Sequence, residues 1–240
     1  MWPFGKKSPS LRASGLLQGS TDWHSHILPG VDDGFQDMEE SLKALATLEE
    51  LGVKDLWLTP HIMEDYPNAT DDLKKQFEQL KEVYKGKMKL HLASENMLDS
   101  LFEERLADND FLPIGESGGH LLVETSYYNP PMNLYELLEE IKRKGYYPLL
   151  AHPERYRYMD TSDYLRLKDM GVLFQANYLS LVGAYGATAQ KKLEWLLEKG
   201  MVDLIGSDLH RNAVLDSMIE ASPRSKKHLE AMRMAALNAL

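Results

Sequence analysis

The stretch TDWHSHILPGVDDG, residues 21–34, decides how the rest of the chain is interpreted. It begins as a short strand-like run, carries two histidines one residue apart, and then reaches the turn-forming pair Pro29–Gly30. Residues i and i+2 of a strand point to the same side, so His24 and His26 would face one centre while Ser25 faces away. Alone, the pair fits either two metal ligands or two polar residues at the mouth of a turn.

Further short apolar runs follow this stretch, and amphipathic segments separate them. This alternation is typical of an α/β fold in which parallel strands are joined by crossover helices. Seven predicted strands indicate a (β/α) barrel. The predicted strands are Thr21–His26, Asp55–Thr59, Lys89–Glu95, His120–Thr125, Tyr147–His152, Val172–Leu179 and Asp203–Ser207.

The segments between the strands have apolar residues at helical spacing and end in glycine, as capped crossover helices do. In residues 37–52, for example, Leu45 and Leu48 lie on one helical face. The final residues, 216–240, are predicted to form one or two helices interrupted at Pro223. The other predicted crossover helices are residues 71–86, 133–145, 161–171 and 188–200.

Composition limits the classes of function. A chain of 240 residues with 43% apolar residues can bury one large core, so residues 20–240 are expected to form a single domain. The formal charge of -10 leaves no general basic surface, which argues against nucleic acid as the main partner. The chain has no cysteine, so disulfides, thiolate metal ligands and a cysteinyl-phosphate mechanism are excluded.

Residues 1–19 are expected to form a flexible N-terminal tail. Their apolar pieces are too short and broken for the core of a signal peptide or for a membrane span. A loose cytoplasmic tail is therefore favoured over a contact with a membrane surface through Trp2 and Phe4. We expect a cytoplasmic protein without stable membrane insertion.

Residues able to bind a metal fall at the ends of six predicted strands, at or just after the last apolar positions. In a parallel barrel these strand ends open onto one face, where barrel active sites lie. One histidine at a strand end is more often a hydrogen-bonded structural residue, but the repetition at six ends favours a shared metal site. The candidate ligands are His24, His26, His61, Glu95, Glu124, His152, Asp208 and His210.

The remaining histidines provide a contrast. His91, His120 and His228 lie early in strands or in the last helix, so we expect them to be structural or exposed. A set of His, Asp and Glu ligands with several carboxylates suits divalent ions such as Mn, Fe or Zn. Bridging carboxylates would place ions about 3.5–4 Å apart, where a shared hydroxide can attack while neighbouring ions bind phosphoryl oxygens. The pattern therefore predicts hydrolysis of a phosphoester.

Two arginines follow the fifth predicted strand in AHPERYRY, residues 151–158. Arg155 comes three residues after His152, within reach of the same face. Its planar guanidinium stays protonated, so it could orient a phosphate ester and offset charge on the transferring oxygens. Arg157 is the weaker candidate, and a surface salt bridge is the alternative role for either side chain.

Six motifs together resemble those of a known family: DWHSHILPGVDDG, LTPH, ASE, LLVET, LLAHPERY and GSDLH. Their order and spacing resemble the polymerase and histidinol phosphatase (PHP) superfamily. HILPGVDDG and AHPERY are most similar to the bacterial manganese-dependent protein-tyrosine phosphatases of capsular and exopolysaccharide operons, and VETSYYNPPMNL resembles their Bacteroidetes-type members. The resemblance runs from about Thr21 to His210. It implies a distorted seven-stranded (β/α) barrel that holds three divalent metal ions, manganese above all.

The resemblance also implies how the ligands share these ions. The first ion would be bound by His24, His26, Glu95 and Asp208. Glu95 would bridge to a second ion, which is held also by Glu124 and His152. The third ion would be held by Asp33, His61 and His210, and Asp32 is the rival of Asp33. Arg155, Asp208 and His210 are the residues expected to carry catalysis.

Members of this family remove phosphate from tyrosines in the C-terminal tail of a bacterial tyrosine kinase that regulates polysaccharide synthesis. The resemblance thus predicts a metal-dependent protein-tyrosine phosphatase. A metal-bridging hydroxide would attack phosphorus in line while Arg155 stabilises the equatorial oxygens. The leaving phenol, with a pKa of about 10, needs less help from a general acid than an alkyl alcohol would.

One position departs from the family pattern. Leu215 stands where a second phosphate-binding arginine is often found, and Arg211 is the nearby residue that could bind substrate in its place. Two alternatives therefore stay open: a PHP phosphatase for a small phosphomonoester such as histidinol phosphate, and a metal-stabilised module that binds a phosphotyrosine tail without turnover. A nuclease role is disfavoured by the net charge.

Overall fold

Short parallel strands form the centre of the structure, a computed structural model that describes residues 8–240. Within this range nine strands pair in two sheets, one in the order β1-β2-β4 and one in the order β3-β5-β6-β7-β8-β9, and every pair is parallel. The strands are β1 (Thr21–Ser25), β2 (Asp55–Leu58), β3 (His61–Ile62), β4 (Lys89–Leu92), β5 (Glu95–Met97), β6 (His120–Glu124), β7 (Tyr147–Ala151), β8 (Leu173–Asn177) and β9 (Leu204–Gly206).

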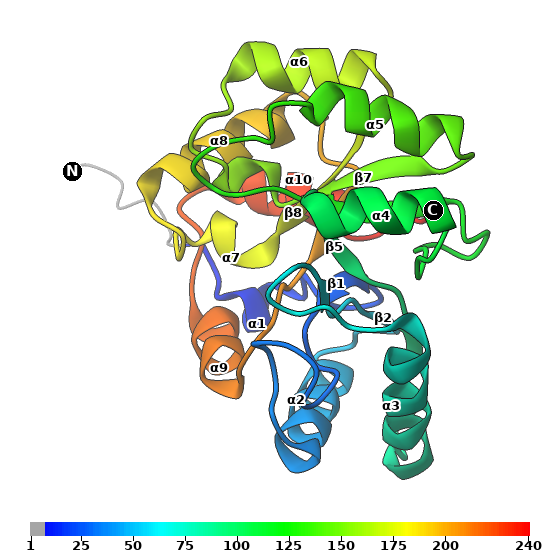
Figure 1. The fold of residues 1–240 in the computed structure, drawn as a ribbon. Helices are drawn as coiled ribbons and strands as arrows, with labels where there is room; N and C mark the ends of the chain where they lie inside the picture. The colour runs from blue at the N-terminus through cyan, green and yellow to red at the C-terminus, as the bar shows by residue number, and fades with distance from the viewer. Residues whose placement is uncertain (1–7) are drawn as a thin grey trace.

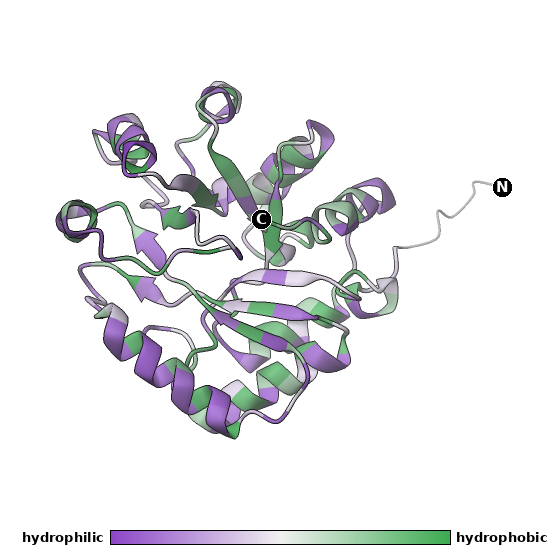
Figure 2. Cartoon of the chain, turned by 90° about the vertical axis from the view of Figure 1, so that its right-hand side faces the viewer, coloured by the Kyte–Doolittle hydropathy of each residue, from purple (hydrophilic) through white to green (hydrophobic). Residues whose placement is uncertain are grey.

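Helices surround these strands (Figure 1), and green apolar positions on them alternate with purple polar ones (Figure 2). The five predicted crossover helices are present as α2, α3, α5, α6 and α8, while α4 was not predicted. The helices are α1 (Leu11–Ser14), α2 (Met38–Glu50), α3 (Thr70–Val83), α4 (Ser100–Asp108), α5 (Leu134–Arg143), α6 (Thr161–Asp169), α7 (Tyr178–Leu181), α8 (Ala187–Glu198), α9 (Asn212–Glu220) and α10 (Lys226–Ala235), with a turn of 3-10 helix, η1, at Pro153–Arg155. As predicted, Pro223 separates the last two helices.

The structure shows nine strands where seven were predicted, because a further short strand follows β2 and another follows β4. β3 lies beyond the second predicted strand, which ended at Thr59, and β5 begins at Glu95, the last residue of the third. β2 and β3 are separated at Pro60, which has no N–H group to donate to a sheet. β4 and β5 are separated at Ser94, whose N–H donates to the carbonyl of Leu112 (3.0 Å) outside the ladder. The count of seven is therefore not confirmed, although each predicted position contains a strand.

Backbone hydrogen bonds connect β1 with the segment that follows β9, and so link the two sheets. The N–H of Asp208 donates to the carbonyl of His24 (2.7 Å), and the N–H of His26 donates to the carbonyl of Leu209 (3.0 Å). The sheets therefore curl around a common axis instead of lying side by side as flat layers (Figure 2). The ends of β1 and β9 meet where the metal-binding candidates begin.

A bulge in β1 changes where its side chains point. Asp22 pairs with Leu56 and Ser25 pairs with Leu58, so two residues, 23 and 24, oppose the single residue Trp57. A bulge of this kind re-aims one side chain relative to the strict alternation of a strand. Trp23 can therefore join an apolar cluster although its neighbour, residue 24, belongs to the site described below.

Two apolar clusters hold the strands. The larger one lies between helices and strands and includes Leu45 and Leu48, as the helical spacing predicts. The smaller one takes side chains from both sheets, and the stacked rings of Trp23 and Trp57 lie 5.7 Å apart within it. We call this smaller group the floor cluster: Trp23, Trp57, Ala93, Ile114, Leu122, Leu149, Ala151 and Leu204.

Residues 8–19, expected to belong to a flexible tail, pack instead against the end of α9. Leu11, Leu16 and Leu17 are buried, and the N–H of Leu11 donates to the carbonyl of Ala221 (2.9 Å). These apolar side chains find a partner surface that the sequence does not reveal. Residues 1–7, and with them the expected membrane contact of Trp2 and Phe4, lie outside the described residues.

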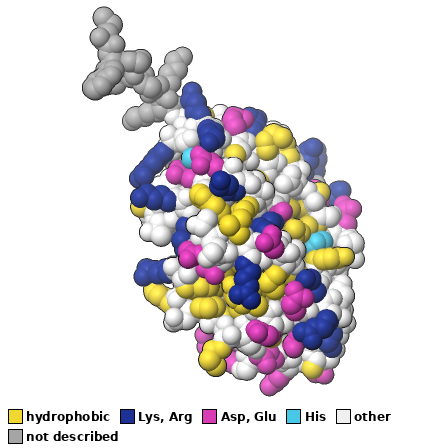
Figure 3. Space-filling view, turned by 90° about the horizontal axis from the view of Figure 1, so that it is seen from above, with side chains coloured by type: hydrophobic (Ala, Val, Ile, Leu, Met, Phe, Trp, Pro, Cys, Tyr) yellow, Lys and Arg dark blue, Asp and Glu magenta, His cyan; other side chains and the backbone are white. Residues whose placement is uncertain are grey.

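Charged side chains of both signs are scattered over the face shown in Figure 3. Within residues 8–240, no helix combines the length and the apolar character needed to cross a bilayer.

Candidate metal centre

Glu95 lies at the centre of a group of histidines. Its Oε2 atom is 3.1 Å from His24 Nε2, 3.2 Å from His26 Nε2 and 3.2 Å from His61 Nδ1, while its Oε1 atom is 3.1 Å from His152 Nε2. The side chain is fully buried. His61 of β3 and Glu95 of β5 are paired in register. The pairing of the two additional short strands, β3 and β5, thus sets these two residues side by side.

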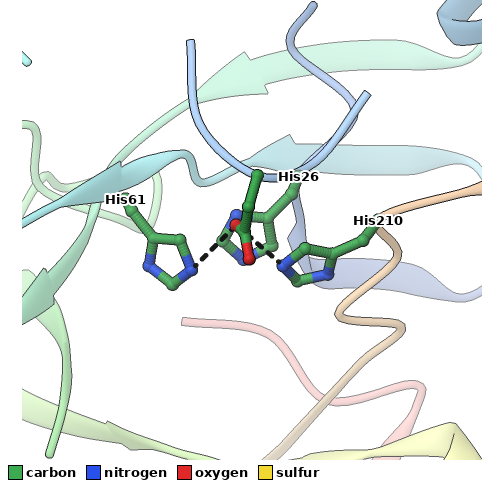
Figure 4. A group of neighbouring side chains, drawn as sticks. His26, His61 and His210 are labelled. Atoms are coloured by element: carbon green, nitrogen blue, oxygen red, sulfur yellow. Dashed lines mark ion pairs between the residues drawn. The ribbon is translucent and has the colours of Figure 1, made fainter. Parts of the chain in front are cut away.

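All nine expected ligands meet around this carboxylate. Figure 4 shows His26, His61 and His210 converging from different segments of the chain. Asp33 Oδ1 is 3.6 Å from His61 Nε2 and 3.4 Å from His210 Nε2. Four groups have ligand atoms within 4.8 Å of one another: His26, Asp33, His61 and His210; His24, Glu95 and His152; His24, His26 and Asp208; and His61, Glu95 and Glu124. We refer to these nine residues as the ligand cluster.

The two neighbouring aspartates after ILPG have different surroundings. Asp33 belongs to the ligand cluster, and its side chain is 50% exposed at the mouth. Asp32 is buried behind the cluster, where it accepts hydrogen bonds from His26 Nδ1 (2.8 Å) and from the backbone N–H of His61 (3.0 Å). Such a carboxylate behind a histidine fixes the orientation of the ring and its tautomer. Asp32 is therefore placed to orient a ligand and not to act as one.

In their neutral forms, His24 of β1 and His26 directly after it would present unprotonated nitrogens to the centre. His24 Nδ1 lies 2.7 Å from Gln175 Oε1, an atom that only accepts, so this nitrogen carries the proton. His26 Nδ1 donates to Asp32 in the same way. The two Nε2 atoms then lie 3.0 Å apart with their lone pairs free. Because such lone pairs repel each other, a cation between them would stabilise the arrangement.

Other buried donor atoms face the same space. Glu95 Oε2 and His61 Nδ1 have no hydrogen-bond partner among the described residues, and neither is reached by solvent. Buried polar atoms without a partner are costly unless an ion or water completes them. The donor set, together with these incomplete atoms, fits divalent metal ions.

Two residues of the ligand cluster have a left-handed backbone. His152 has φ 34° and Asp208 has φ 52°, and among the described residues other than glycine only Asn109 shares a positive φ. This conformation is uncommon outside glycine and persists where the surroundings impose it, often at functional sites. In both cases the backbone turns directly after a strand, β7 or β9, and aims the side chain into the cluster.

Electrostatics keep the central carboxylates ionised. Burial opposes the charge of Glu95, but the facing His24 and His61 hold its pKa well below the ordinary value. Burial likewise opposes the charge of Asp208, and His24 and Arg155 lower its pKa. In return, although burial disfavours its protonated form, Glu95 and Asp208 raise the pKa of His24 to about 9. Cations must balance these carboxylates, and metal ions bound to neutral histidines would do so in place of protons.

A cavity of about 470 Å³ opens over the ligand cluster, and Arg155 forms part of its wall. The guanidinium pairs with the carboxylate of Asp208, which also accepts a hydrogen bond from Asn177 Nδ2 (2.9 Å). A second cavity, of about 520 Å³, shares Arg155, Asp208 and His210 and adds Arg211. Both expected substrate-binding arginines therefore border spaces that adjoin the cluster.

The other positions named in the sequence lie away from the centre. Arg157 is exposed, with its guanidinium 4.8 Å from the ring centroid of Tyr128. Leu215 is buried in α9, so this position points into the core and not to the mouth.

The contrast histidines have the structural or exposed roles expected of them. His91 stacks on Trp57 with ring centroids 4.7 Å apart, and its Nε2 atom lies 2.9 Å from Asp55. His228 on α10 pairs with Glu198 (3.2 Å). Neither belongs to a group of metal-capable residues, and nor does His120.

Two supporting residues were missed in the sequence. Gln175 and Asn177 are buried in β8, the strand to which no ligand was assigned. They hold His24 and Asp208. Two polar residues at the end of an otherwise apolar strand were the available sign, because a buried amide needs partners of this kind.

Comparison with known sequences connects this geometry to one family. The family described as capsular polysaccharide synthesis, CpsB/CapC, matches residues 20–237. CapC of Staphylococcus aureus is 30% identical over 195 residues, covering 79% of this chain and 76% of that protein. YwqE of Bacillus subtilis is 28% identical with the same coverage, and CpsB of Streptococcus pneumoniae is 28% identical over 202 residues, covering 79% of this chain and 82% of that protein. The last two are named tyrosine-protein phosphatases.

Solved structures support the fold. One from a study of YwqE from Bacillus subtilis and CpsB from Streptococcus pneumoniae, described as metal-dependent tyrosine phosphatases, superimposes with a TM-score of 0.69. It covers 92% of this chain and 99% of that chain at 21% identity. A phosphotriesterase homology protein from Escherichia coli, solved with phosphate in its active site, has a TM-score of 0.55 at 13% identity and covers 91% of this chain and 92% of that chain. At such identities the similarity concerns the fold alone.

Proposed function

The chain belongs to the CpsB/CapC family of capsular polysaccharide synthesis, and from that premise we propose that it is a metal-dependent protein-tyrosine phosphatase. One observation carries the proposal. Nine His, Asp and Glu side chains from several strand ends and one loop form a cluster beneath one cavity, and an arginine stands in the cavity wall. Divalent ions and an arginine are the two features that phosphoryl transfer needs for binding and charge stabilisation.

We propose that the ligand cluster holds three divalent ions, with manganese as the first choice and iron or zinc as substitutes. The groups support this division only in part. Asp33, His61 and His210 share one group, and His24, His26 and Asp208 share another, whereas Glu95 is grouped with His24 and His152 and again with His61 and Glu124. Such ions, when bound, supply positive charge for phosphoryl oxygens and lower the pKa of a water molecule that attacks phosphorus.

The chain's own residues would bind and orient the substrate. Arg155 can offer its planar fork to two phosphoryl oxygens, and its charge persists at any working pH. Asp208 keeps this guanidinium at the cavity, because the two side chains pair directly. His210, with 25% of its side chain exposed, stands at the mouth beside Asp33. The leaving phenolate can take its proton from water there, since a phenol is a good leaving group.

Arg211 is proposed as a second substrate-binding residue. It lines the cavity that Arg155 also borders. The buried position of Leu215 supports this assignment, because a side chain there cannot reach the phosphate.

The expected partner is the phosphorylated tail of a bacterial tyrosine kinase of capsular or exopolysaccharide synthesis, and the expected site of action is the cytoplasm. Both rest on the family and on its named relatives. We further propose that residues 20–240 act as one domain with a distorted seven-stranded barrel, in which β2 with β3 and β4 with β5 each serve as one strand. The hydrogen bonds that link β1 to the end of β9 support closure.

The test is phosphate release after metal removal and reloading. The purified chain is stripped with a chelator, reloaded with Mn, Fe or Zn, and given three substrates: a phosphotyrosine peptide, the same peptide with phosphoserine, and histidinol phosphate. Hydrolysis of the phosphotyrosine peptide that depends on metal and exceeds the other two rates is expected. A faster rate on histidinol phosphate would favour the small-molecule alternative, and binding of the peptide without phosphate release would favour the non-catalytic module.

Two ligand variants and one control make this test specific. Asp208→Asn keeps a residue type that tolerates the left-handed backbone, so a loss of activity reports the lost ligand and not a strained turn. His26→Ala removes a ligand that lies directly after β1. His228→Ala on α10 is the matched control, since it removes an imidazole remote from the cluster. Full activity in either ligand variant would contradict the proposal.

A further inference from the structure

The guanidinium of Arg155 lies between two tyrosine rings. Its Cζ atom is 4.5 Å from the ring centroid of Tyr127 and 4.1 Å from that of Tyr185. The three residues come from separate segments: Tyr127 follows β6, Arg155 ends η1, and Tyr185 precedes α8. A cation over the face of an aromatic ring at this distance is attracted by the ring's negative face.

The same guanidinium also forms an ion pair with a carboxylate. It pairs with Asp208, which is itself held by Asn177. The carboxylate takes one guanidinium nitrogen, Nη1, and the contacts with the two rings leave the other N–H groups without a named acceptor in these pairs. Arg155 lines both cavities beside the ligand cluster, so its side chain borders the space where a phosphoryl group would lie.

A free arginine would not keep this orientation. Arginine has several rotatable bonds, and fixing them costs side-chain entropy. Tyr127 itself is held, because its ring packs 5.7 Å from that of His152 and 6.1 Å from that of Tyr156. The ring is thus fixed between the ligand cluster and the arginine.

We propose that Tyr127 and Tyr185 are positioning residues that clamp Arg155 and present its fork to an incoming phosphoryl group. The proposal rests on the function proposed above, because it takes the phosphoryl group as the ligand of Arg155. Neither tyrosine needs to touch the substrate. Their contribution is to reduce the ordering that phosphate binding would otherwise require of Arg155.

A neighbouring pair provides a matched control. Arg157 lies over the ring of Tyr128, with 4.8 Å from Cζ to the ring centroid, but Tyr128 is 61% exposed and the pair borders none of the ligand cluster. Tyr128 directly follows Tyr127 in the sequence. Tyr128→Leu therefore removes a similar contact from the same loop without changing the surroundings of Arg155.

The experiment measures the dissociation constant of inorganic phosphate by calorimetry on the Mn-loaded protein. Tyr185→Leu is expected to weaken phosphate binding by about three- to tenfold, the range that the loss of one cation–π contact allows. Tyr185→Phe keeps the ring face and should bind within about twofold of the unaltered protein. Tyr127→Leu should weaken phosphate binding to a similar extent, and it replaces Tyr185→Leu in the experiment if that variant does not fold. Tyr128→Leu should leave the constant unchanged.

A double variant shows whether the tyrosine acts through the arginine. Arg155→Lys keeps the charge and loses the planar fork, so it should weaken phosphate binding by itself. If Tyr185 acts by holding Arg155, adding Tyr185→Leu to Arg155→Lys should cause little further loss. Equal losses from Tyr185→Phe and Tyr185→Leu, full additivity in the double variant, or unchanged binding in Tyr185→Leu would each overturn the clamp.

The outcome is separable from that of the proposed function. If the loaded protein does not hydrolyse the phosphotyrosine peptide but Tyr185→Leu still weakens phosphate binding, the clamp stands and the proposed function falls. If the peptide is hydrolysed and the tyrosine variants bind phosphate normally, the function stands and the clamp is overturned. A loaded protein that binds no phosphate at all also overturns the clamp.

Discussion

The floor cluster and the ligand cluster arise from the same strands, yet they differ completely in chemistry. Ala93 and Leu122 belong to the floor cluster, whereas Glu95 and Glu124, two residues further along, belong to the ligand cluster. Within β6, residues i and i+2 share a side, so this strand passes from the apolar layer at Leu122 to the charged one at Glu124. In β1 the bulge at residues 23 and 24 lets Trp23 lie in the floor cluster while residue 24 lies in the ligand cluster.

The floor cluster contributes mainly to the stability of the fold, and the ligand cluster provides the chemistry. Apart from two indole N–H groups, the side chains of the floor cluster are apolar, so the charge of the buried carboxylates above it is balanced by histidines, Arg155 or metal ions. A surrounding of low polarity also strengthens the attraction between these carboxylates and a cation. We therefore expect changes in the ligand cluster to abolish activity and leave folding intact, and changes in the floor cluster to do the reverse.

The largest effect is expected for Glu95→Gln. The amide has almost the same shape but cannot supply the charge that faces four histidines. We expect kcat/KM on a phosphotyrosine peptide to fall by about a thousandfold or more, the scale seen when a preorganised charge of a reaction centre is lost. Metal content, measured by mass spectrometry, should fall with it.

Metal removal should affect this variant and the unaltered protein differently. Ions that bind only the folded state raise its stability by mass action, by about 2.7 kcal/mol at a hundredfold excess over Kd. The unaltered protein should therefore melt at a lower temperature after chelation, and Glu95→Gln should show a much smaller difference. An equal difference in both proteins would show that the ions bind elsewhere.

A smaller loss is expected for Asp32→Asn. Asp32 does not enter the ligand cluster but holds His26 Nδ1 at 2.8 Å. Removing such an orienting carboxylate lowers metal affinity by about 10- to 100-fold. Activity should therefore be low at limiting Mn and return at high Mn. Asp37→Asn, a change at the exposed N-cap of α2 where either residue is suitable, is the control. Activity that stays low at saturating Mn would give Asp32 a direct part in the reaction.

The difference between Asp32 and Asp33 shows what the sequence could and could not predict. The ends of the strands could be predicted from the apolar runs. Eight ligands could then be predicted because the ends of parallel strands open onto one face. Asp33 came only from the resemblance, because it lies in a loop without periodicity. The choice between the two aspartates depends on the fold of residues 27–34, where the loop returns to let the backbone N–H of Phe35 donate to His26 (3.0 Å).

Contacts between distant segments could not be predicted from the sequence. Gln175 meets His24 across a separation of 151 residues, and the rings that enclose Arg155 come from loops on either side of it. The interruption at Pro60 could have been foreseen from its missing N–H group. The interruption at Ser94 could not, since it depends on the carbonyl of Leu112 being nearby.

Leu122→Ala should reverse the pattern seen for Glu95. Leu122 is fully buried in the floor cluster, two residues before Glu124 on β6. Its truncation should lower the free energy of unfolding by about 2–5 kcal/mol, measured by urea denaturation. At a temperature where the variant is folded, metal content and kcat should stay close to those of the unaltered protein. Loss of metal before unfolding would show that the two layers are not separable.

The smallest effect is expected for His91→Phe, which tests whether position or residue type makes a histidine a ligand. His91 lies on β4, but its neighbours are Trp57, on which it stacks, and one carboxylate, Asp55, at 2.9 Å. Phenylalanine keeps the stack and loses a hydrogen bond between side chains that are 30% and 28% exposed. The loss in stability should therefore be about 1 kcal/mol or less, with no change in metal content or kcat. A drop in metal content would mean that the ligand cluster extends past the floor cluster. An unchanged content, beside the inactivity of His26→Ala, would show that a histidine here becomes a ligand only where several strands bring carboxylates to it.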